Sequence, residues 1–208
     1  MFDADDLVRG VLTGVMGGRP KRSKKALRYL TGRRGGMLSN PQTLLTMAGV
    51  AWGIFETLQN QGPATGSPGP QPAHVPSPPL PDVQAAAGVP PDAMRMVRLS
   101  IAAASADGAL SDADRSRIVE HARQAGAEHL IEHELQNRRP LQEIVAGVTD
   151  PAQRATLYVL AFGIIRADES VSGAERIFLA QLAHQLGLDP ATVSKLEADA
   201  SARIDSQE

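Results

Sequence analysis

One pattern, an apolar helix followed by an acidic loop and a second helix, occurs twice in the C-terminal half of the chain with an offset of 61 residues. The first copy reads Ala106-Asp-Gly-Ala-Leu-Ser-Asp-Ala-Asp-Arg115, and the second reads Ala167-Asp-Glu-Ser-Val-Ser-Gly-Ala-Glu-Arg176. Repeated supersecondary units bury their apolar faces against their neighbours. The helix–loop–helix duplication therefore predicts that both copies belong to one all-α domain.

Apolar residues recur at helical spacing from residue 91 onward, and helix start signals divide this part of the chain. Asp150 stands before Pro151, and such a pair places an N-cap before a proline at the first helical position. Together these signals predict about seven helices over 91–205. Aromatic residues make up only 3% of the sequence, so the core must be built from aliphatic side chains. The apolar positions predicted for the helix after Ser172 are Ile177, Leu179, Leu182 and Leu186.

The prolines separate this domain from the N-terminal part of the chain. Residues 62–91 contain ten of the fifteen prolines. Because such a stretch cannot form a packed, hydrogen-bonded element, we predict a disordered linker over 62–90. The chain then divides into a head over 1–61, this linker and a helical domain over 91–205. The head carries nine basic and four acidic residues, whereas residues 90–208 carry twelve and eighteen, so the two ends should have different partners.

The head contains one strongly apolar segment. Asn40 and Pro41 predict the start of a helix over 42–59, which is apolar on every side between Leu44 and Phe55. This run is shorter than the roughly twenty residues that a membrane span requires. Two interpretations remain open: association with a membrane surface, or packing against protein, including self-association. The residues assigned to this contact are Leu44, Leu45, Gly49, Trp52, Gly53 and Phe55.

Four acidic residues take equivalent places in the two copies of the repeat. Asp107 and Asp168 end the first helix of each copy, and Asp114 and Glu175 follow the serine that begins the second helix. Oxygen ligands suit Ca²⁺, Mg²⁺ or Mn²⁺, so one hypothesis is that the four side chains line a shared cation site. The alternative is structural. A serine followed three residues later by an acid fits the capping box, in which both side chains bond backbone N–H groups.

The paired loops, A-D-G-x-L-S-x-x-D-R and A-D-x-x-V-S-x-x-E-R, are followed after the second copy by L-A-H-Q-L-G-L-D-P. Over roughly residues 92–203 this pattern resembles the TerB-like tellurite-resistance fold, and more closely the YebE-like group of bacterial inner-membrane proteins. The resemblance implies a compact all-α domain with a role in metal or oxyanion stress. It also implies a bacterial cytoplasmic protein associated with the inner membrane. The acidic positions of the family's motif fall on Asp107, Asp114, Asp168 and Glu175.

Signatures of catalysis are weak in this sequence. The chain has no cysteine, which excludes thiolate catalysis and Cys-ligated metals. His129-Leu-Ile-Glu-His133 matches the H-x-x-E-H pattern of some metallopeptidases, but no further ligand or substrate cleft is indicated. The basic stretch from Arg19 to Arg34 has one aromatic residue, Tyr29, which argues against nucleic-acid binding. We therefore predict a non-enzymatic binding or sensing module with no identified small-molecule substrate. The alternative is a structural protein–protein adaptor without metal.

Overall fold

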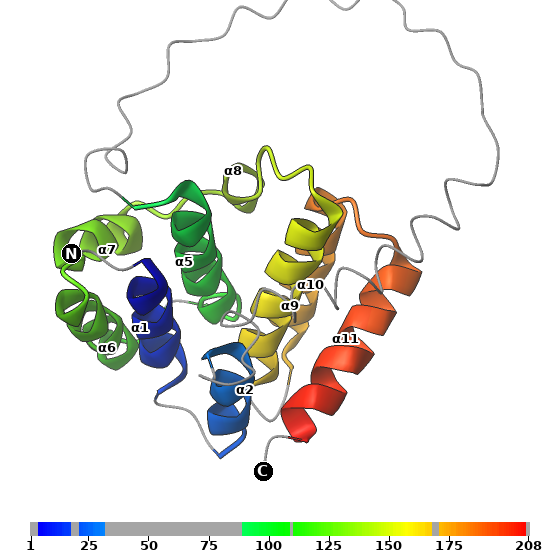
Figure 1. Ribbon diagram of the computed structural model, residues 1–208, viewed down its shortest axis with the longest axis horizontal. Helices are drawn as coiled ribbons and strands as arrows, with labels where there is room; N and C mark the ends of the chain where they lie inside the picture. Colours follow the sequence, from blue (N-terminus) through cyan, green and yellow to red (C-terminus); the bar gives the residue numbers. More distant parts are fainter. Residues whose placement is uncertain (1–3, 18–20, 32–88, 109, 168–170, 207–208) are drawn as a thin grey trace, which may run out of the picture.

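The computed structural model describes residues 4–17, 21–31, 89–108, 110–167 and 171–206. In these ranges the regular secondary structure consists of nine helices, which confirms the predicted all-α class (Figure 1). Seven of the nine lie between residues 91 and 205, the number that the sequence predicts for this part. The helices are α1 (Ala4–Met16), α2 (Lys21–Thr31), α5 (Pro91–Ala104), α6 (Asp112–Gln124), α7 (Glu128–Gln136), α8 (Leu141–Ile144), α9 (Pro151–Arg166), α10 (Gly173–Gln185) and α11 (Pro190–Asp205).

The helices begin where their capping residues stand. Asp150 accepts a hydrogen bond from the backbone N–H of Gln153, and Asp189 caps α11 in the same manner, each with a proline directly after it. Ser111 and Ser172 begin α6 and α10. A side-chain acceptor at these positions satisfies N–H groups that have no partner within the helix. Local sequence therefore sets four of the helix starts.

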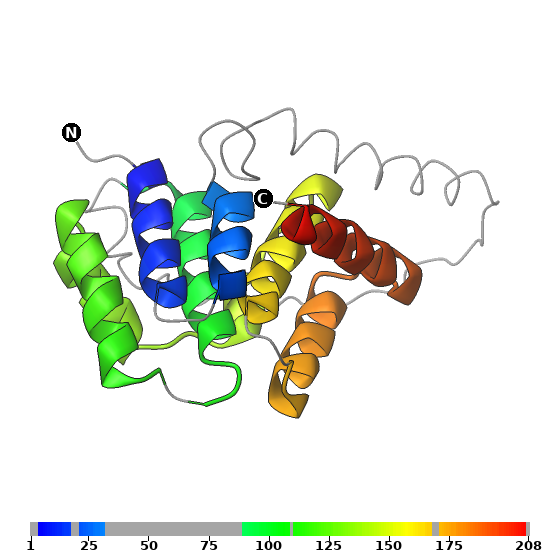
Figure 2. The same cartoon turned by 90° about the horizontal axis from the view of Figure 1, so that it is seen from below.

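The two N-terminal helices share one hydrophobic core with the rest of the described chain. Helix α1 packs against α5 and α6 and lies between them, while α2 packs against α9 and α11 (Figures 1 and 2). Leu7 and Leu12 of α1 and Leu30 of α2 are fully buried in this core. The sequence predicts a head over 1–61 apart from the helical domain, but the hydrophobic core extends across that division.

Glycines allow α1 to approach α6 closely. A Cβ atom at Gly14 would lie 2.7 Å from the Cα atom of Ile118, and one at Gly10 would lie 3.2 Å from the carbonyl oxygen of His121. Real Cβ atoms do not approach backbone atoms at the shorter of these distances. The two glycines are four residues apart and so share one face of α1. Their missing side chains therefore determine how closely the two helices pack.

The duplication is longer than the sequence pattern indicates. Helices α6 and α10 start and end at the same offset of 61 residues, and each is followed by a glycine with positive φ, Gly126 at +72° and Gly187 at +65°. After each glycine the next backbone N–H reaches back to a helix carbonyl at 2.9 Å, from Ala127 and from Leu188. Such a glycine ends a helix without the steric cost of a Cβ atom. The repeated unit thus comprises three helices, α5–α7 and α9–α11.

The copies pack differently despite this local similarity. Helix α10 packs directly on α9, whereas α1 lies between α5 and α6. Ile118, which α1 covers in the first copy, corresponds to Leu179 of α10, which is buried as well.

None of the helices in the described ranges has the length and hydrophobicity that crossing a membrane requires. The apolar segment 42–59, with the contact residues predicted within it, lies outside the described residues. Of the predicted linker only the last two residues are described, and Val89 among them is buried in the core.

Candidate functional site

The acidic residues of the two loops do not come together where the structure describes them. Asp107 lies in an exposed turn after α5, and Asp168 lies outside the described residues. Asp114 belongs to α6 and Glu175 to α10, and these helices lie on opposite flanks of the molecule (Figures 1 and 2). In the described ranges no three His, Cys, Asp or Glu side chains form a group that could hold a metal ion. The shared cation site therefore stays a prediction.

Glu175 serves as a helix cap. The backbone N–H of Ser172 donates to Oε2 of Glu175 at 2.7 Å, and the backbone N–H of Glu175 donates to Oγ of Ser172 at 3.2 Å. This reciprocal pair is the capping box that the sequence offers as the structural alternative. The side chain is only 3% exposed, so its carboxylate is occupied by the backbone of its own helix start.

Asp114 takes a related but different position at the start of α6. Its backbone N–H donates to Oγ of Ser111 at 3.1 Å, and the Ser111 hydroxyl donates to Oδ2 of Asp114 at 2.6 Å. Its other carboxylate oxygen pairs with Arg117, one turn further along the helix. Asp114 thus stabilises the start of α6, where an acidic side chain interacts favourably with the helix dipole.

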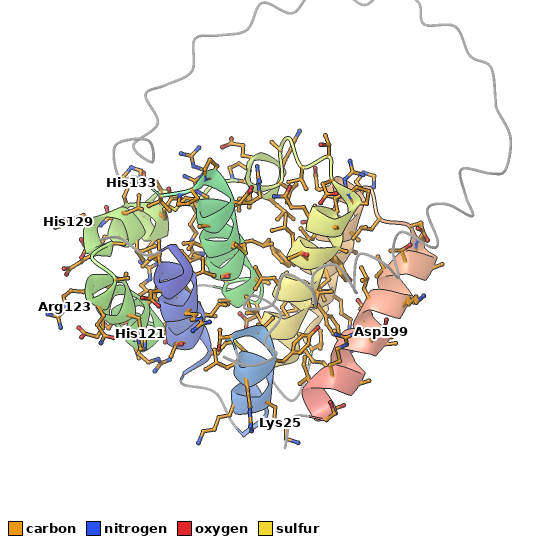
Figure 3. The ribbon with its side chains drawn as sticks, viewed as in Figure 1. Lys25, His121, Arg123, His129, His133 and Asp199 are labelled. Atoms are coloured by element: carbon orange, nitrogen blue, oxygen red, sulfur yellow. The ribbon has the colours of Figure 1, made fainter. Side chains whose placement is uncertain are left out.

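The two histidines of the H-x-x-E-H pattern lie on the outer surface of α7 (Figure 3). The side chain of His129 is 98% exposed, and its Nδ1 lies 3.6 Å from a carboxylate oxygen of Glu132. His133 is exposed as well. The part of the chain that the structure describes supplies no further metal ligand beside them.

A groove with a volume of about 420 Å³ lies between α5 and α10, closed at its sides by the end of α7 and by α8. Its apolar lining comes mainly from Ile101 and Ala102 of α5, Ile144 of α8 and Phe178 of α10. Ile177 stands at its rim and is 62% exposed, the one large hydrophobic side chain in the described ranges that is exposed. The groove therefore offers an apolar surface to a ligand.

The groove side of α10 differs from the same positions of its duplicate, α6. Ile177 of α10 corresponds to Ser116 of α6, and Phe178 corresponds to Arg117, at the offset of 61. Ser116 is exposed to solvent, whereas the guanidinium of Arg117 contacts α1 through a 3.5 Å hydrogen bond from its Nε to the carbonyl oxygen of Gly14. Two positions that are polar in one copy are thus apolar in the copy that lines the groove.

Charged side chains line the groove next to α7. Arg98 of α5 donates from Nε and Nη2 to the two carboxylate oxygens of Glu134 at 2.8 and 2.6 Å. These side chains are only 12% and 4% exposed. Arg138 and Arg139 also line the groove, are exposed, and form no ion pair with a described carboxylate. Three arginines and one glutamate give this lining a formal charge of +2.

Sequence reasoning did not identify this groove. It placed Ile177 among the core positions of α10, and the structure corrects this. A helix turns about 100° per residue, so Ile177 lies about 200° from the buried Leu179 around the helix axis. This spacing could have indicated that Ile177 is exposed. No comparable signal existed for the ion pair, since Arg98 and Glu134 are 36 positions apart.

Comparison with known proteins places the chain in a family. The family described as "Protein of unknown function (DUF533)" matches residues 3–200, so the chain belongs to this family. Neither the search of curated proteins nor the search of solved structures found a match.

Proposed function

We propose that this member of the DUF533 family is a non-enzymatic protein–protein adaptor, whose binding site is the groove between α5 and α10. The observation that carries the proposal is the exposure of Ile177 beside an apolar groove. Covering a branched apolar side chain of this size contributes about 1.5–3 kcal/mol to binding before the costs of association. An exposed anchor at the edge of a concave apolar surface is typical of protein recognition sites.

The groove lining favours binding over reaction. Its one carboxylate, Glu134, bonds the guanidinium of Arg98 with both oxygens and so is not available as a base. The remaining polar lining consists of arginines, a glutamine and the hydroxyl of Ser105, which donates to the carbonyl oxygen of Ile101 at 2.6 Å. A nucleophile requires an adjacent base to activate it, and none lines this groove.

The adaptor proposal takes precedence over the cation sensor because of the capping geometry. Asp114 and Glu175, two of the four acids of the predicted cation site, are bonded to helix-start groups. The stress-associated role implied by the TerB-like and YebE-like resemblance is retained as part of the proposal. Residues 42–59, which lie outside the described residues, are retained in the proposal as the segment for attachment at the inner membrane or for packing against protein, including self-association.

The proposal is tested by site-specific photocrosslinking in cells. A crosslinking side chain replaces Ile177 in the full chain, and the matched control carries it at Ser116, the exposed equivalent position on α6. We expect a discrete protein adduct from position 177 only, and its loss when Ala174→Arg fills the groove. Equal adducts from both positions, or none from 177, would count against the adaptor.

A calorimetric titration of the full chain distinguishes the adaptor from the cation sensor. With Ca²⁺, Mg²⁺ or Mn²⁺ we expect no saturable heat. Saturable binding that disappears in the Asp107→Asn/Asp168→Asn variant would return the function to cation sensing.

A further inference from the structure

The shape of the groove indicates which kind of segment it accommodates. Along α10, the residues that line it are Ala174, Ile177, Phe178 and Gln181. Their spacing of i, i+3, i+4 and i+7 forms one continuous stripe on the helix. The facing wall is formed by α5 and the turn after it, where Ala102 and Ala106 are small. Small residues on both walls allow the backbone of a third helix to approach closely.

The molecule itself contains an example of such a packing. In the first copy of the duplication, α1 lies against both α5 and α6. Its residue Gly14 contacts Arg117 and Ile118 of α6, and Arg117 is the position that corresponds to Phe178 in α10. On α10, Phe178 lines the open groove, whereas Leu179, the counterpart of Ile118, is buried. At Arg117, the counterpart of the groove residue Phe178, the fold therefore already places a helix.

The charge of the groove indicates which charged side chain the partner helix should carry. The guanidinium of Arg98 is already occupied by Glu134, and both are nearly buried. Arg138 and Arg139 are exposed and have no ion-pair partner among the described residues. An arginine binds a carboxylate through two parallel hydrogen bonds, which gives geometric specificity as well as attraction. A carboxylate on the ligand would meet these two arginines.

We propose that the partner segment is an amphipathic helix from another protein, with apolar residues at i, i+3 or i+4, and i+7, and an aspartate or glutamate beyond one end of this apolar stripe. The apolar residues cover Ile177 and Phe178, and the acid binds Arg138 or Arg139. This inference rests on the proposed adaptor function and names its partner class. It also places the acidic end of the helix beside Arg138 and Arg139, which follow α7.

A peptide selection on the full-length protein tests the inference. A displayed library of sixteen-residue helical peptides is selected on the wild-type chain, and the enriched peptides are synthesised for anisotropy titration. We expect enriched sequences to combine the apolar spacing with an acid at one end. Their Kd should rise at least about tenfold with Ile177→Asp, the loss expected for a central anchor. It should rise several-fold with Arg138→Ala/Arg139→Ala, and the wild-type Kd should rise with added salt.

Two control variants use the duplicated helix. Ser116→Asp places the same charge at the exposed equivalent of position 177, and Arg123→Ala removes an arginine that is 60% exposed on α6. Both should leave the Kd unchanged. All these substitutions fall on exposed positions, and thermal unfolding checks that each variant is folded.

The other outcomes separate the inference from the adaptor proposal. Peptides that require Ile177 but lack an acid, or that ignore the arginine variant, overturn the inference and leave the adaptor standing. Failure to enrich any peptide that depends on Ile177 overturns the inference, while the crosslinking experiment decides the adaptor separately. If the protein forms dimers that Ile177→Asp dissociates in sedimentation, the occupant is a second copy, and the proposed partner helix is wrong.

Discussion

Glu134 is a charged side chain that is only 4% exposed, and its two oxygens bond the guanidinium of Arg98. Transfer of such a pair out of water costs as much as the attraction returns, unless the geometry satisfies both partners. Here both oxygens are satisfied, and no buried polar side-chain atom in the described ranges lacks a hydrogen-bond partner. The pair therefore fixes the end of α7 against α5, beside the groove.

Removal of one member of the pair should be more damaging than removal of both. Glu134→Leu leaves the guanidinium of Arg98 without its buried partner, and we expect a loss of about 3–5 kcal/mol in the free energy of unfolding. The double variant Arg98→Met/Glu134→Leu should recover most of this loss. Urea denaturation of the full chain measures both values. A double variant as unstable as the single one would contradict the argument.

Tyr158 is 1% exposed and donates its hydroxyl to Oε1 of Glu197 at 2.6 Å, joining α9 to α11. Burial raises the pKa of Tyr158 well above its ordinary value, and the hydrogen bond to Glu197 raises it further. The proton is thus held more tightly in the folded chain than in the unfolded one. The resulting stabilisation is complete below the unfolded pKa of about 10 and is lost as the pH rises above it.

The Tyr158→Phe substitution separates two contributions to stability, that of the hydrogen bond to Glu197 and that of the ionisation of Tyr158. At neutral pH we expect the variant to be about 1 kcal/mol less stable, because the hydrogen bond is lost. Above about pH 10 the difference should shrink and then reverse, since phenylalanine cannot ionise in the unfolded chain. Denaturation curves at neutral and alkaline pH test this. A difference that stays constant across the range would show that Tyr158 does not titrate as its environment requires.

Among the helices, α1 packs in a way that depends on glycines, which have no side chain. An alanine normally favours a helix over glycine by about 0.5–1 kcal/mol. At Gly14 the added Cβ atom would lie 2.7 Å from the backbone of Ile118, so α1 or α6 has to move. Close packing therefore reverses the stability change that a glycine-to-alanine substitution in a helix usually gives.

Gly14→Ala should therefore destabilise the protein, by about 1–3 kcal/mol, the range typical of overpacking. Gly173→Ala is the matched control, because a Cβ atom at Gly173 meets no other atom within 4 Å. That variant should be neutral or slightly stabilised. Thermal unfolding of both full-length variants gives the comparison. A Gly14→Ala variant as stable as the control would mean that α1 does not pack closely on α6.

The sequence predicted those features of the helices that depend on neighbouring residues. Asp150 and Ser172 start helices as their local patterns require, because a cap acts over three residues. It predicted less well what depends on distant contacts. The ion pair of Arg98 joins it to Glu134, 36 positions further along the chain. The packing of α1 on α6 also joins residues about a hundred positions apart, which no local periodicity can indicate.

At the scale of the whole molecule, the two N-terminal helices complete the hydrophobic core. Helices α1 and α2 cover faces of α5, α6, α9 and α11. Ile118 on α6 is fully buried, and α1 supplies its contact at Gly14. The domain that the sequence predicts over 91–205 therefore lacks part of its own interior.

A chain shortened to residues 90–208 should not fold like the full protein. Without α1 and α2 the exposed apolar faces would favour aggregation or a loosely packed state. We expect a loss of the cooperative thermal transition seen for the full chain, measured by circular dichroism. Addition of the missing residues as a separate peptide should restore part of it. A shortened chain that unfolds cooperatively at the same temperature would show that the N-terminal helices are dispensable.

The position of α1 also has a consequence for synthesis on the ribosome. Arg117, which bonds the carbonyl oxygen of Gly14, emerges 103 residues after it. At about 5–20 residues per second, the apolar face of α1 waits roughly 5–20 s for its partner. During this interval the nascent chain displays valines and leucines that the finished protein conceals. We therefore expect this face of α1 to stay exposed to solvent until α6 has been made.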